Sequence, residues 1–203
     1  GKPLHNAILD RILTLFDMNL PVTGHLRFLD RLMNNPDYRA VNETYGFIES
    51  CDLPITVDGY FLAYKIVRDD YRDIYSGTFD NSVGQIPTVR RNEVDTDATR
   101  TCSHGLHVCS KGYLPHYGSA TGSRIMVVKV DPADVVAVPI DYNNAKMRVC
   151  KYEVVSEIPY DEVFDNNPMD RYHTEHFGEE DDLEDDLEDD DEWDGIGEED
   201  DDE

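Results

Sequence analysis

Residues 60–67 read YFLAYKIV, and this stretch decides how the middle of the chain is interpreted. It is rich in β-branched and aromatic side chains, and the Asp58-Gly59 pair before it is typical of a turn, so it predicts a β-strand. Further strands are predicted at 74–75, 106–108, 124–130, 135–138 and 148–155. Residues 53–160 are therefore interpreted as a β-rich α+β domain with mostly antiparallel strands, carrying a long surface loop at 81–100.

The residues before this domain have the spacing of helices. Apolar side chains recur every three or four positions from Leu4 to Ile48. Thr23 is the predicted N-cap of a second helix, and Pro36 is predicted in the first turn of a third. Residues 1–52 are therefore expected to form a helical N-terminal region of short helices.

Acidic residues are concentrated at the C-terminal end. The chain of 203 residues has 18 Lys and Arg against 44 Asp and Glu, and 20 of the acidic residues lie between Glu175 and Glu203, where there is no Lys or Arg. This composition predicts a linker and a disordered acidic tail over 161–203. Four apolar residues in it (Leu183, Leu187, Trp193 and Ile196) leave open that the tail orders on a basic partner.

The charge balance excludes several classes of protein. Phosphate contacts need a cationic face, so no direct nucleic-acid binding is expected, although three short helices also fit a helix-turn-helix outline. No run approaches the roughly 20 apolar residues of a transmembrane helix. Four cysteines are too few for a disulfide scaffold, and no secretory signal is visible, which indicates a reducing cytoplasm.

Two cysteines and two histidines fall within residues 102–109, namely Cys102, His104, His107 and Cys109. They are side chains that zinc prefers, and a Cys–His pair is also a candidate for nucleophilic catalysis. Side chains of an extended strand alternate between faces, however, so four ligands from one short strip do not easily surround an ion. No metal site is predicted, and packed thiols are the favoured interpretation.

A second polar set flanks the predicted strands. Tyr64, Asn143, Lys146 and Arg148 are candidate ligand-binding residues, because Lys and Arg can hold a phosphate or a carboxylate. Candidate catalytic residues are Lys65, His107 and Glu153. The chain contains no phosphate-binding loop, dinucleotide glycine fingerprint or zinc-protease motif, and no cofactor is assigned.

Three long motifs carry a resemblance to a known family: LPITVDGYFLAYKIVRDDYRDIYSGTFDNSVGQ, CSHGLHVCSKGYL and DYNNAKMRVCKYEVV. In this order they resemble the bacteriophage family related to the rapid-lysis rIIB protein of T-even phages. The resemblance implies an early phage protein in the host cytoplasm, peripheral at the inner membrane, that affects lysis timing or protects infection from prophage-encoded exclusion. It also implies a partner, an rIIA-type phage protein or a host protein, and supplies no catalytic residues.

The layout of the strands is also similar to that of ADP-ribosyltransferase-like domains. That likeness implies a basic or aromatic residue on an early strand (Lys65 or Tyr64), a polar residue near the second (His107 or Ser110) and a late Glu153. The leading expectation is a non-enzymatic accessory protein that binds a protein partner. The alternatives are an NAD- or nucleotide-binding domain centred on Lys65, His107, Lys146 and Glu153, and an acidic decoy of a DNA-binding host factor.

Overall fold

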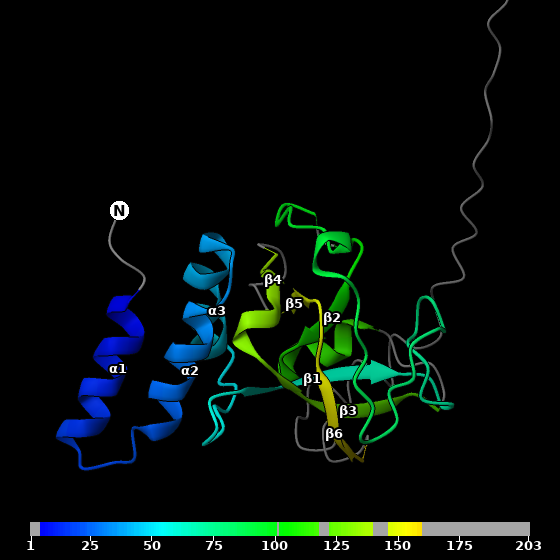
Figure 1. The fold of residues 1–203 in the computed structure, drawn as a ribbon. Coiled ribbons are helices and arrows are strands. Elements are labelled where there is room, and N and C mark those ends of the chain that lie inside the picture. The colour runs from blue at the N-terminus through cyan, green and yellow to red at the C-terminus, as the bar shows by residue number, and fades with distance from the viewer. Residues whose placement is uncertain (1–4, 101, 118–121, 140–145, 160–203) are drawn as a thin grey trace, which may run out of the picture.

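The computed structural model describes residues 5–100, 102–117, 122–139 and 146–159. Three α-helices come first, and Figure 1 shows them together at one end of the molecule, beside the strands. They are α1 (His5–Asp17), α2 (Thr23–Met33) and α3 (Tyr38–Ser50). The predicted acidic tail and Asn143 lie outside the described residues.

The helix α2 begins where the sequence predicts, but its cap is different. The residue before its first turn is Val22, whose backbone is already near helical with φ −100° and ψ −9°. The carbonyl of Val22 accepts from the Leu26 amide at 3.0 Å, so Thr23 lies inside the first turn and no side chain caps the helix. The prediction that Thr23 is the N-cap is therefore wrong.

The start of α3 is set by an aspartate. The Asp37 carboxylate accepts from the backbone amides of Arg39 at 2.8 Å and Ala40 at 3.3 Å, which satisfies donors that the first turn would leave free. Pro36 thus lies before the cap and not in the first turn, where it was predicted.

Six strands form one sheet in the order β4-β5-β2-β1-β3-β6, and every neighbouring pair is antiparallel. The strands are β1 (Phe61–Val67), β2 (Leu106–Cys109), β3 (Arg124–Val130), β4 (Val135–Ala137), β5 (Lys146–Val149) and β6 (Glu153–Ile158). Short 3₁₀ helices occur at Arg91–Glu93, Lys111–Tyr117 and Pro132–Asp134. The α+β class with an antiparallel sheet is confirmed.

The sheet is strongly rolled. β5 and β6 stand four strand spacings apart in the sheet order, which is about 19 Å in a flat sheet. Residues 150–152 alone connect them and span at most about 14 Å. The turn between β3 and β4 crosses the same gap, and the amide of Cys150 donates to the carbonyl of Asp134 at 2.9 Å. The two connections therefore meet and hold the roll closed at this end.

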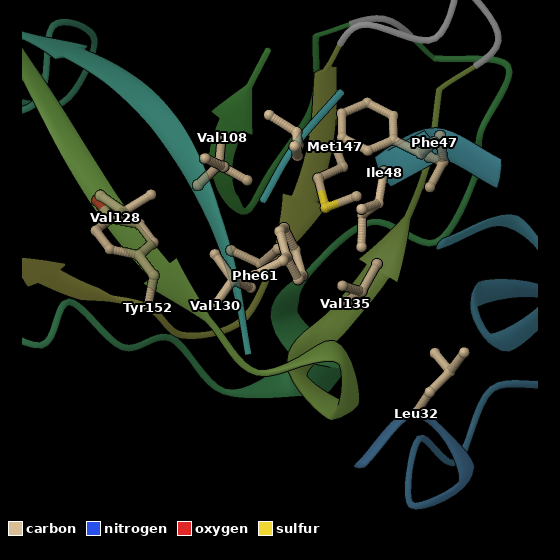
Figure 2. Packing of buried hydrophobic residues seen from close by; sticks show 14 of the residues in the cluster. Leu32, Phe47, Ile48, Phe61, Val108, Val128, Val130, Val135, Met147 and Tyr152 are labelled. Carbon is tan, nitrogen blue, oxygen red and sulfur yellow. The ribbon is translucent and has the colours of Figure 1, made fainter. Parts of the chain in front are cut away.

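One core joins the helices to the sheet. Phe28 of α2 packs edge-on against Tyr45 of α3 and Phe61 of β1, with ring centroids 6.2 Å and 6.5 Å apart. Figure 2 shows Phe61 and Val135 from the strands facing the same space as side chains of the helices. This continuous packing fixes where the β1 and β2 strands begin relative to the helices.

Three local predictions need correction. Residues 74–75 form a turn, not a strand, because isolated bridges at Val67–Asp73 and Arg72–Asp80 close a loop there. The predicted strand at 148–155 is divided between β5 and β6, since at residues 150–152 the chain passes from β5, which lies next to the edge strand β4, to the opposite edge strand β6. The 81–100 segment is irregular as expected, but Asn81, Val94 and Ala98 are buried, so it is not only a surface loop.

Candidate functional site

The central strands of the sheet are paired very unequally. All seven residues of β1 are in register with β3, whereas β1 and β2 share a single register pair, Tyr64 with Cys109. The two strands diverge beyond that pair. A cavity of about 360 Å³ opens there, lined by residues from both strands, from β5 and from the segments 73–79 and 102–105.

Lys65 bridges the two diverging strands. Its Nζ donates to the backbone carbonyl of His107 at 3.1 Å and lies 5.7 Å from the centre of the Tyr152 ring. Burial lowers the pKa of Lys65, while the negative charge of Asp73 acts in the opposite direction. The ammonium thus takes the place of a strand-to-strand hydrogen bond and stands in the wall of the cavity.

His107 contributes its ring to the same wall. Nε2 of the imidazole is buried and has no hydrogen-bond partner among the residues that the structure describes. Burial, followed by the positive charges of Lys65, Lys146 and Arg148, lowers the pKa of His107 to about 3, against a smaller opposing effect of the Gly105 backbone. The ring is therefore neutral at physiological pH.

Lys146 is the most buried charged group of the cavity. The residue is only 4% exposed, and its Nζ lies 3.8 Å from Sγ of Cys102 and 5.4 Å from the centre of the Tyr113 ring. In the described ranges, neither Lys146 nor Lys65 forms an ion pair with a carboxylate. A buried cation without a counter-ion is costly, because its hydration is lost without full replacement.

The carboxylate of Asp73 is occupied in shaping the cavity. It accepts from the backbone amides of Ser76, Thr78 and Phe79 at 2.8–2.9 Å, which folds residues 73–79 into a tight turn against the opening. Burial raises the pKa of Asp73, but hydrogen bonds from Phe79 and Ser76 outweigh it and lower that pKa overall. The sequence interpretation did not include Asp73 or Ser76, although an Asp three residues before Ser-Gly is a known turn pattern.

The cavity unites part of the predicted polar set. Lys65, His107 and Lys146 all line it. Glu153 does not: it lies exposed on the edge strand β6, opposite Lys129 of β3. The combination of Lys65, His107 and Glu153 implied by the transferase-like layout is thus only partly brought together.

The other two described candidates for ligand binding, Tyr64 and Arg148, have structural contacts. The Arg148 guanidinium is fully buried and donates to the carbonyls of Arg100 at 2.8 Å and Asp97 at 2.5 Å, so it anchors the loop before β2. Tyr64 packs against the hydrophobic clusters on the sheet and does not line the cavity.

The cysteines and histidines of residues 102–109 do not all share one site, because Cys102, His104 and His107 line the cavity and Cys109 does not. Cys109 is buried and its thiol donates to the carbonyl of Tyr64 at 3.4 Å, whereas His104 is exposed and its Nδ1 lies 2.6 Å from the carbonyl of Glu93. Within the described residues, no three His, Cys, Asp or Glu side chains are grouped so as to hold a metal ion. Over the same part of the chain, none of the helices has the length and apolar character needed to cross a membrane.

Comparison with known proteins places the chain in a family. The family model described as bacteriophage T4 protein rIIB matches residues 1–162. Protein rIIB of Enterobacteria phage T4 is 48% identical over 155 residues, which cover 76% of this chain and 49% of that protein, so the chain spans about half the length of this curated relative. No solved structure matches the chain. The chain therefore belongs to the bacteriophage T4 rIIB family.

Proposed function

We propose that this chain is a phage accessory protein that acts through a protein partner to modulate lysis timing or to counteract prophage exclusion. It works in the host cytoplasm, at the periphery of the inner membrane, and its partner is an rIIA-type phage protein. Family membership supports the phage setting, and the resemblance supports the role and the partner. The structural observation that carries partner binding is a second apolar stripe on α1.

The α1 helix is apolar on two sides. Ile8, Ile12 and Leu15 face the interior, with exposed fractions of 0%, 9% and 6%. Leu9, Leu13 and Phe16 form a second stripe on the helix, with exposed fractions of 41%, 60% and 69%, and Leu20, three residues beyond the end of the helix, is 45% exposed. A contiguous row of large exposed apolar side chains marks an interaction surface more often than scattered ones do.

The spacing of the second stripe indicates its occupant. Positions 9, 13 and 16 lie four and three residues apart, which is the spacing of a seam between two packed helices. An amphipathic helix of the partner protein fits such a narrow seam. We therefore assign the α1 stripe to a helix of the rIIA-type partner.

Copurification tests this assignment. The chain with a tag is coexpressed with the rIIA-type protein as wild type, as Phe16→Glu, and as the control Tyr38→Glu, which changes an aromatic that is 74% exposed on another helix. We expect Phe16→Glu to reduce the copurified partner at least about tenfold, because a carboxylate cannot enter an apolar seam without losing hydration. Tyr38→Glu should have no effect, and circular dichroism confirms that both variants fold.

Two outcomes contradict the proposal. One is equal copurification of the partner by wild type and Phe16→Glu. The other is a wild-type chain that dimerises alone and becomes monomeric in Phe16→Glu, because the stripe is then an interface between two copies. Deleting residues 175–203 should leave copurification unchanged, whereas the acidic-decoy alternative requires that deletion to abolish activity.

The nucleotide-binding alternative has a specific observation in its favour, the cavity between β1 and β2. An ADP-ribosyltransferase-like activity has less support, since Glu153 is exposed on β6 and does not line the cavity.

A further inference from the structure

We propose that the cavity between β1 and β2 binds the phosphate group of a small phosphorylated molecule, with Lys65, Lys146 and His107 as its contacts. This site is independent of the partner surface on α1, because no residue that lines the cavity belongs to α1. Its charge, the geometry of its donors and its apolar walls support the proposal.

The charge in the cavity is unbalanced. Two lysines with largely buried side chains lie in one wall, and among the described residues they contact a carbonyl, a thiol and two aromatic rings. The carboxylate that faces the same space, Asp73, is already bonded to three backbone amides of its own turn. An anion entering the cavity supplies the counter-charge that both ammoniums lack among the described residues, and it gains two charge-assisted hydrogen bonds.

The donors suit a phosphate better than a carboxylate. Lys65, Lys146 and the buried Nε2 of His107 give three polar groups from three strands, β1, β5 and β2. All three residues line the cavity, and Lys65 Nζ lies 3.1 Å from the carbonyl oxygen of His107. A phosphate presents three terminal oxygens in three directions, whereas a carboxylate presents two in one plane. The neutral imidazole of His107 donates one hydrogen bond to a phosphate oxygen when Nε2 carries its proton.

The remaining walls accommodate an organic group. Phe79, Leu106 and Tyr113 line the cavity, and its volume of about 360 Å³ exceeds what a free phosphate needs. Such a volume lies at the lower end of the range for small-molecule sites, and aromatic walls favour a flat ring. Adenosine monophosphate is therefore the probe with both required features.

Thermal unfolding of the full chain tests the proposal. Adenosine monophosphate, inorganic phosphate, adenosine and succinate are titrated separately at constant ionic strength. A ligand that binds only the folded state raises Tm in a saturable manner. We expect adenosine monophosphate to raise Tm most, inorganic phosphate to raise it less, and adenosine and succinate to leave it unchanged. Equal effects of the two phosphates would identify free phosphate as the natural ligand, and the site assignment would stand.

Two variants locate the binding. Lys146→Met and Lys65→Met each remove one ammonium group from the cavity. Lys111→Met is the control, because it removes an exposed ammonium group outside the cavity. We expect both cavity variants to lose at least tenfold in affinity for adenosine monophosphate and Lys111→Met to keep it. The proposal is overturned if no phosphate probe raises Tm of the wild type, if succinate alone does, or if the cavity variants respond like the wild type.

Discussion

Two buried polar regions of this molecule are built in opposite ways. At the junction between the helices and the sheet, the amide of Asn35 donates to the carbonyls of Pro132 at 2.9 Å and Val135 at 2.8 Å. Its carbonyl oxygen accepts from the Asp37 amide at 3.0 Å and from the Arg91 guanidinium at 2.7 Å. In the cavity between β1 and β2, by contrast, the described residues offer no hydrogen-bond partner to Nε2 of His107, and the Lys146 ammonium contacts a thiol and an aromatic ring.

The difference distinguishes polar groups that stabilise the fold from polar groups that we propose bind a ligand. Satisfied networks stabilise and specify a core, whereas unsatisfied buried groups cost free energy. A protein keeps such a cost where function requires it. The junction should therefore tolerate no substitution, while the cavity should tolerate loss of its charges or become more stable.

The largest effect is expected at the junction. Asn35→Leu removes four hydrogen bonds, which should lower the free energy of unfolding by about 4 kcal/mol, although the carbonyls of Pro132 and Val135 each keep one other donor. Urea denaturation measures it. A loss below about 1 kcal/mol would show that the junction is not the satisfied network described above.

The turn before β1 should be almost as sensitive. Gly59 has φ +83°, and a Cβ there would lie 2.5 Å from the backbone carbonyl carbon of Arg27 in α2. Gly59→Ala should therefore cost about 3 kcal/mol, from overpacking and from the left-handed backbone. Gly84→Ala is the matched control, because Gly84 has φ +88° with no heavy atom within 4 Å of a Cβ, so only the backbone penalty of about 1 kcal/mol applies. Equal losses for the two variants would contradict the close contact.

The buried imidazole of His107 in the cavity should make the stability of the protein depend on pH, and this effect is smaller than those of the two substitutions above. Burial lowers the pKa of His107 from 6.5 to about 3, so the unfolded chain takes up a proton below pH 6.5 while the folded chain does not. Stability is thus fully present above pH 6.5 and is lost as the pH falls toward 3. Between pH 6.5 and 5 the loss from His107 amounts to about 1.5 kcal/mol.

His107→Gln removes this contribution. Urea denaturation at several pH values should show a flatter profile for the variant than for the wild type. His25, whose pKa is also lowered by burial and by Arg11, accounts for part of the remaining slope, and His25→Gln is the control. Identical slopes for His107→Gln and the wild type would show that the ring is accessible to water.

Much of the fold follows from local pattern, and the site does so only in part. Apolar spacing locates the helices, and the runs at 60–67 and 124–130 locate the two best-paired strands, because burial on both sides selects β-branched residues. The division of 148–155 depends on the rolling of the sheet, which brings distant edges within the reach of three residues. Pairing of that kind is a tertiary property that no local pattern reports.

The candidate residues show the same limit. Lys65, His107 and Lys146 were predicted from their chemistry, and the structure brings them to one cavity. The likeness to a transferase layout predicts Glu153 beside them, but the structure places it on β6, outside the lining of the cavity. Asp73 was missed because its role, holding a turn through backbone amides, is visible only once 73–79 closes against the cavity.

One measurement tests the contrast between the two regions most directly: urea denaturation of Lys146→Met without ligand, beside Asn35→Leu. Lys146→Met should unfold at a higher urea concentration than the wild type, with a gain of about 1 kcal/mol, since methionine keeps most of the apolar stem and removes a buried charge that lacks a counter-ion. Asn35→Leu should unfold at a lower one. If Lys146→Met instead destabilises the protein as much as Asn35→Leu does, Lys146 belongs to the structural network, and the proposal that it binds an anion in the cavity is contradicted.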